Sequence, residues 1–140
     1  MKMTTNIAQA TLILLFSCTS TLAGPLLIVN TSVEETVLGQ DEVQLIFLGK
    51  KKKWSNGNKI HVVTLKQGPV HEAFLKTVVK KTPAKFSSYW KIATVTGTGI
   101  PPKSFDSEEA LVKYVAGKEG AVGYVSSNTP VEGVQLIPIK

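Results

Sequence analysis

The residues best placed to do chemistry lie in one short stretch, Lys66 to His71. A hydrophobic segment ends at Gly68, and Pro69 then sets the backbone for the first turn of a helix. Free backbone amides at the start of a helix bind anions in many proteins. The pattern indicates a small-anion site formed by Lys66, Gln67, Gly68 and His71. An ordinary connection between a strand and a helix has the same pattern and remains the alternative.

Groups for catalysis or metal binding are scarce in this chain. His71 and Glu72 are adjacent, so in a helix their side chains point in different directions and form no catalytic pair. His61 alternates with apolar neighbours, which favours a histidine that lies at an edge or is hydrogen-bonded within the fold. The single cysteine, Cys18, lies near the N-terminus, and two histidines are too few for a metal centre. The sequence therefore predicts a protein that is not an enzyme and has no cofactor.

The first 23 residues have the pattern of a secretory signal. Lys2 precedes an apolar run from Ile7 to Phe16, and small residues lead to a cleavage site at Ala23. The run has about half of the ~20 apolar residues that a membrane-spanning helix needs. We expect residues 1–23 to be a signal peptide and residues 24–140 to be one periplasmic or secreted domain without a transmembrane segment. The alternative is a lipoprotein, anchored through Cys18.

Positive charge dominates the sequence. Lysine and arginine together number 16 against 10 acids, the net charge is +6, and every one of the 16 is a lysine. The guanidinium group of arginine usually recognises phosphate and guanine through two parallel hydrogen bonds, so the absence of arginine argues against a nucleic-acid partner. The densest charge is the run Lys50–Lys53, followed by Trp54. It is either a solvated loop with Trp54 packed on the core, or an anion or anionic-lipid patch in which Trp54 anchors at the interface.

Alternating strands and helices must position these groups. Apolar runs predict strands at 26–29, 60–65, 121–125 and 134–139. A helix is expected over 40–48, closed by Gly49, and further helices begin at Pro69, Pro83 and after Asp106. This order predicts an α/β domain with a mixed sheet flanked by helices.

Helical spacing also predicts which faces are buried. In the helix from Pro69, His71, Glu72, Lys76 and Lys80 are expected to point outward. In the next helix an aromatic stripe faces the core, formed by Phe86, Tyr89, Trp90 and Ala93. Asp106 is expected to cap the last helix, with Glu109 reaching back to it.

The order of these motifs resembles the phosphate-binding proteins of ABC transporters, within the type II periplasmic binding proteins. The matching residues are Ile28-Val29-Asn30, Ile46 to Lys50 followed by Trp54, Phe74, Tyr89-Trp90, the loop Gly97 to Pro102, and Gly120 to Val125. The resemblance covers nearly all of the chain after the signal. It implies the fold of one of the two α/β lobes between which that family clamps its anion, and the chain is long enough for only one.

The site itself departs from the family pattern. Where the family has an arginine followed by a Gly-Ser-Gly-Thr type turn, this chain has Leu65 to His71, which keeps Gly68 and replaces hydroxyl donors with Pro69 and Val70. The resemblance implies an exported solute-binding domain that binds phosphate or another small oxyanion weakly, at an altered site. The alternative is an interaction or signalling-adaptor protein whose half-cleft docks a protein partner or a second copy.

Overall fold

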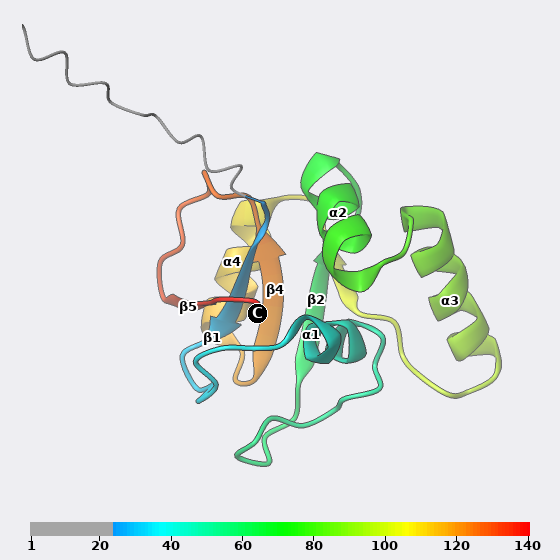
Figure 1. Ribbon diagram of the computed structural model, residues 1–140, viewed down its shortest axis with the longest axis horizontal. Helices are drawn as coiled ribbons and strands as arrows, with labels where there is room; N and C mark the ends of the chain where they lie inside the picture. Colours follow the sequence, from blue (N-terminus) through cyan, green and yellow to red (C-terminus); the bar gives the residue numbers. More distant parts are fainter. Residues whose placement is uncertain (1–23) are drawn as a thin grey trace, which may run out of the picture.

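The fold is a mixed five-stranded sheet between helices (Figure 1), seen in a computed structural model that describes residues 24–140. The predicted signal peptide, and the alternative lipid attachment at Cys18, therefore lie outside the described residues. The strands are β1 (Leu26–Asn30), β2 (His61–Leu65), β3 (Lys103–Phe105), β4 (Ala121–Val125) and β5 (Val134–Ile137), in the order β3-β2-β4-β1-β5. Strand β2 runs parallel to β3 and β4, whereas β1 is antiparallel to β4 and β5. The predicted α/β architecture with a mixed sheet is confirmed.

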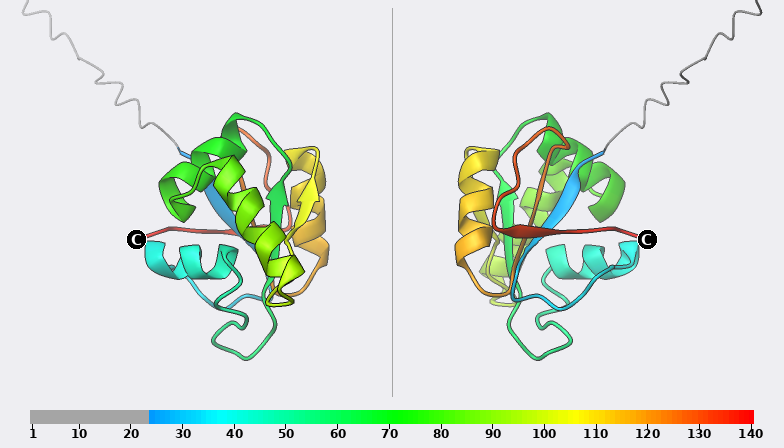
Figure 2. Two further views of the ribbon diagram at one scale, coloured as in Figure 1. Left: turned by 90° about the vertical axis from the view of Figure 1, so that its right-hand side faces the viewer. Right: turned by 90° about the vertical axis from the view of Figure 1, so that its left-hand side faces the viewer.

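Helices cover both faces of the sheet. They are α1 (Gln40–Phe47), α2 (Pro69–Phe74), which continues as the π-helical segment η1 (Leu75–Val79), α3 (Pro83–Val95) and α4 (Glu108–Gly117). Figure 2 shows α4 on one side of the sheet and α1 with α2 on the other, while α3 stands at the margin beside α2. None of the helices within residues 24–140 is both long and apolar enough to cross a bilayer.

Strands β1 and β4 form the centre of the core. The side chains of β4 and nearly all of those of β1 are buried, as expected of strands that are covered by helices on both faces. Trp54 joins this core, since only 3% of it is exposed and its indole N–H donates to the Gly120 carbonyl at 2.9 Å. The packed interpretation of Trp54 is thus confirmed, and it cannot serve as an interfacial anchor. Gly49 ends α1 with φ of 71°, as predicted.

One local prediction is wrong, and one strand was missed. Ser107, rather than Asp106, caps α4, because its hydroxyl accepts from the Ala110 N–H at 3.1 Å while Asp106 pairs with Lys66. The short edge strand β3 was not predicted, since its three residues are exposed or half-buried and show no apolar run.

The buried face of the helix from Pro69 also differs from the prediction. His71, expected to point outward, is only 6% exposed. Beyond Phe74 the backbone continues as a π-helix. The buried stripe is His71, Phe74, Leu75 and Val78, which has the i, i+3, i+4, i+7 spacing of an α-helix, and Thr77 is exposed. The polar side chain of His71 led the prediction to the neighbouring stripe.

Candidate functional site

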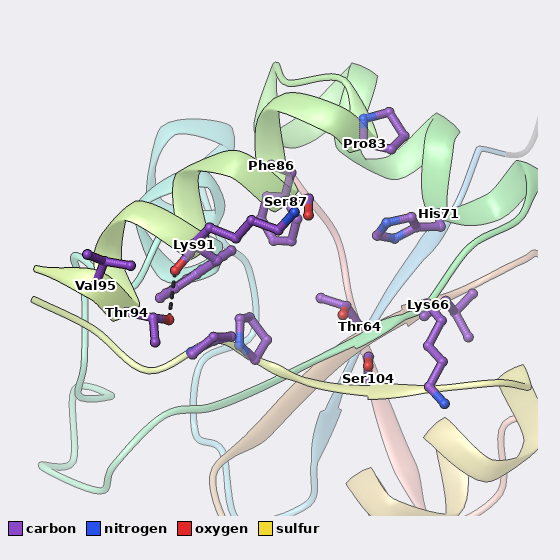
Figure 3. A pocket seen from close by; sticks show the side chains of 14 residues that line it. Thr64, Lys66, His71, Pro83, Phe86, Ser87, Lys91, Thr94, Val95 and Ser104 are labelled. Atoms are coloured by element: carbon purple, nitrogen blue, oxygen red, sulfur yellow. Dashed lines mark hydrogen bonds between the residues drawn. The ribbon is translucent and has the colours of Figure 1, made fainter. Parts of the chain in front are cut away.

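A cavity of about 610 Å³ opens at the carboxyl end of β2, beside β3, and we call it the β2 cavity (Figure 3). The carboxyl ends of strands in an α/β sheet are where ligands usually bind. Its apolar wall comes largely from α3 and from the loop before β3, and includes Pro83, Phe86, Trp90, Pro101 and Pro102. Its polar lining includes Thr64, Lys66, His71, Ser87 and Ser104. The cavity is thus mainly apolar, with a few polar groups.

His71 contacts the buried side chain of Tyr124, which is the largest of the fully buried side chains. The Tyr124 hydroxyl contacts His71 Nδ1 and also accepts a hydrogen bond from the Leu65 N–H at 3.0 Å. If Nδ1 carried a proton, the hydroxyl would accept from both groups and its own proton would have no acceptor among the described residues. We therefore assign the hydroxyl proton to the bond with Nδ1, and this assignment leaves a neutral His71 with its own proton on Nε2.

Burial keeps both members of this pair uncharged. It lowers the pKa of His71, against the smaller opposing effect of Glu72, and it raises the pKa of Tyr124 above its ordinary range despite the Leu65 N–H. Phe74 stacks on Tyr124 with ring centroids 4.1 Å apart, which fixes the position of the hydroxyl. His71 Nε2 makes no hydrogen bond within residues 24–140, so it is a fixed, neutral donor on the wall of the β2 cavity.

The predicted site residues are only partly brought together. Lys66 and His71 line the β2 cavity, whereas Gln67 is exposed and Gly68 forms the turn outside it. Lys66 extends away from His71 in Figure 3, and its ammonium pairs with Asp106 at 3.1 Å. Gly68 has φ of 110°, which side chains disfavour. The Glu72 N–H bonds the Gly68 carbonyl, so the free amides of the first turn are those of Val70 and His71.

Sequence reasoning missed Thr64 and Tyr124 as site residues. Thr64 is buried and makes no side-chain hydrogen bond within the described residues, and Figure 3 shows it below the imidazole of His71. Its polar side chain among apolar neighbours at the end of a strand was the available signal. No comparable signal exists for Tyr124, because its contact with His71 spans 53 residues.

A second, larger and more enclosed cavity of about 930 Å³ lies at the other end of β2, and we call it the lysine groove. Lys50, Lys51, Lys52, Lys59 and Lys103 line it together with apolar residues such as Ile100. Lys51 pairs with Glu42, and the Lys103 ammonium lies 4.8 Å from the Tyr114 ring centroid. Within residues 24–140 no cluster of histidine, cysteine and acidic side chains could hold a metal ion.

Comparison with solved structures identifies the fold. The chain is similar to an ABC-type phosphate transport receptor from Vibrio cholerae, at 19% identity and a TM-score of 0.56, over 83% of this chain and 46% of the receptor. It is similar to a protein from Clostridium perfringens, described as a phosphate ABC transporter substrate-binding protein and solved with bound phosphate, at 21% identity and a TM-score of 0.66, over 83% and 44% of the two chains. PstS from Borrelia burgdorferi aligns at 14% identity and a TM-score of 0.61, over 84% and 47%.

Other comparisons find no relative. No protein-family model matches the sequence, and no curated protein is detectably similar to it. The chain spans less than half the length of each of the three aligned structures. It therefore has the α/β fold of a single lobe of the phosphate ABC transporter substrate-binding proteins.

Proposed function

We propose that this protein is an exported, non-enzymatic solute-binding domain that takes up a small ligand in the β2 cavity. The observation that carries the proposal is that His71 Nε2 and the Thr64 hydroxyl, on two buried side chains that line this cavity, make no hydrogen bond inside the described chain. Buried polar groups are normally hydrogen-bonded, so two free ones on one cavity wall favour a ligand that bonds them.

The chemistry of the wall argues for an altered ligand preference. Phosphate is recognised in proteins by many N–H donors and by cations. Here Pro69 has no N–H, Lys66 is paired with Asp106, and His71 is neutral. A ligand with one carboxylate or other acceptor end and an apolar body suits the neutral donors and the wall of Phe86 and Trp90 better than free phosphate does. Phosphate itself should bind weakly.

Titration calorimetry of the exported protein tests this at low and moderate salt. Benzoate is the apolar monoanion and inorganic phosphate the comparison, and benzoate should bind more tightly. Thr64→Val removes one hydroxyl from the cavity and should weaken benzoate binding by about tenfold, the equivalent of one hydrogen bond of ~1.4 kcal/mol. His71→Ala should weaken it further. Lys66→Ala should act mainly on phosphate, through charge.

Thr77→Val is the matched control. Thr77 is exposed on η1 and does not line the β2 cavity, so its change should leave both affinities unaltered. Phosphate binding without benzoate binding would keep the solute-binding role and refute the altered preference. No heat with either compound, together with a dimer in light scattering, would instead favour the docking of a second copy.

A further inference from the structure

Charge is divided between two parts of the fold. From Val43 to Phe105 the chain has twelve lysines and one acid, Glu72, and we call this segment the basic half. The remainder of residues 24–140 has nine acids and three lysines. In Figure 1 the basic half contributes β2, α2, α3 and the loop after α1, while β1, α4, β4 and β5 lie on the other side. The molecule therefore presents one strongly positive side.

Most of these lysines have no acidic partner. Among the described residues the ion pairs of the basic half are Lys51 with Glu42 and Lys66 with Asp106. Lys50, Lys52 and Lys91 are exposed and lie along the lysine groove and the margin of the β2 cavity, on either side of α3. Their charge is available to an external anionic surface.

Large apolar side chains are exposed at the end of α3 and in the loop after it, and we call this surface the apolar tip. Val95 at the end of α3 is 87% exposed, and Ile100 in the following loop is 88% exposed. Ile92, one turn before Val95 on the outward side of α3, is 64% exposed. Figure 3 shows Val95 at the outer end of the helix. These are the three most exposed of the large apolar residues in the described chain, and all three lie in the last turn of α3 or in the loop that follows it.

We propose that the apolar tip and its flanking lysines form a docking surface for an anionic lipid bilayer. Aliphatic side chains surrounded by lysines match the boundary between headgroups and acyl chains, where the aliphatic groups enter and the ammonium groups meet lipid phosphates. A protein partner fits less well, because protein interfaces are enriched in tryptophan, tyrosine and arginine and depleted in lysine. Trp90 and Phe86 of α3 are buried, Tyr89 is half-buried, and the chain has no arginine. This inference goes beyond the proposed ligand binding and does not depend on it.

Vesicle sedimentation tests the surface. The precursor is expressed with Cys18→Ser, so that no lipid can be attached there, and the exported protein is mixed with vesicles of phosphatidylcholine alone or with one quarter phosphatidylglycerol. We expect binding only to the anionic vesicles and a loss of most of it at about 0.5 M NaCl, where the screening length falls to roughly 4 Å.

Two matched pairs of variants separate the surface from general charge and hydrophobicity. Lys50→Gln/Lys52→Gln/Lys91→Gln should weaken binding by about tenfold or more, whereas Lys113→Gln/Lys118→Gln/Lys140→Gln, with the same change of net charge, should have a much smaller effect. Val95→Ser/Ile100→Ser should weaken it by about fivefold, and Val37→Ser/Leu136→Ser, exposed apolar residues elsewhere, should not.

Three results would overturn the proposal. The first is equal binding to neutral and anionic vesicles, and the second is an equal loss of vesicle binding in the two triple lysine variants. The third is a dimer in light scattering that Val95→Ser/Ile100→Ser dissociates. The last would assign the apolar tip to a second copy of the chain. Circular dichroism spectra of all four variants must match that of the parent, and because every changed side chain is exposed or half-buried we expect them to.

Discussion

Removing the Tyr124 hydroxyl is the sharpest test of the arrangement beneath the β2 cavity. Tyr124→Phe keeps the buried ring and its stacking on Phe74 but leaves the Leu65 N–H and His71 Nδ1 without their shared partner. A buried polar group left unpaired costs about 1–3 kcal/mol. His71 lines the cavity, where water can replace the hydroxyl in part, whereas the Leu65 amide is deeper. We therefore expect a loss of about 2–4 kcal/mol in the free energy of unfolding.

Urea denaturation measures this loss. The midpoint should fall while the slope stays constant, because the folded and unfolded surfaces are nearly unchanged. Tyr114→Phe is the control, since Tyr114 is half-buried and its hydroxyl makes no hydrogen bond within residues 24–140. It should change the stability by less than about 0.5 kcal/mol. A Tyr124→Phe loss as small as that of the control would refute the shared-hydroxyl argument.

Imidazole nitrogen chemical shifts test the tautomer directly. In the parent, His71 should carry its proton on Nε2 across neutral pH, because the Tyr124 hydroxyl occupies Nδ1. In Tyr124→Phe the two tautomers should exchange. A double-mutant cycle with His71→Leu should give a coupling energy of about 1–3 kcal/mol. Additive losses would mean that the two side chains do not share a hydrogen bond.

Three other measurements bear on the fold. Burial lowers the pKa of His71, so the unfolded chain takes up a proton at a higher pH than the folded protein does. The free energy of unfolding, measured by urea denaturation, should therefore be complete above about pH 6.5 and decline below it. His71→Gln should make this decline less steep. Gly120→Ala places a Cβ 2.1 Å from the Lys59 carbonyl oxygen at φ of 74°, and thermal unfolding should show a loss of stability of about 3 kcal/mol or more. Gly57→Ala, where a Cβ meets open space, should cost only about 1 kcal/mol. Equal losses in the two variants would contradict the steric argument. Ser107→Ala should cost about 1 kcal/mol and Asp106→Ala less than about 0.5 kcal/mol, and the reverse order would show that Asp106 is the cap.

The sequence contains the elements of the fold but not the detail of the site. Apolar runs locate β1 and β2, and the Thr82-Pro83 pair locates the start of α3, because these signals are local. The burial of His71 is not local. It depends on Tyr124, which reaches the imidazole from β4. His71, Phe74 and Leu75 have α-helical spacing, but the polar side chain at the first of these positions favoured an outward assignment, so the prediction placed His71 in solvent.

The proposed change of ligand preference rests on two positions in α2, Pro69 and His71. Pro69 removes a backbone donor at the turn, which weakens any cradle for a charged oxygen. Two positions later His71 turns inward, and the buried Tyr124 hydroxyl fixes its tautomer so that it offers a single neutral N–H to a mainly apolar cavity. A single neutral donor adds no positive charge to hold an anion, so the proposed selectivity rests on the shape and apolarity of the wall. The proposed preference is in this way linked to how the core packs under the site.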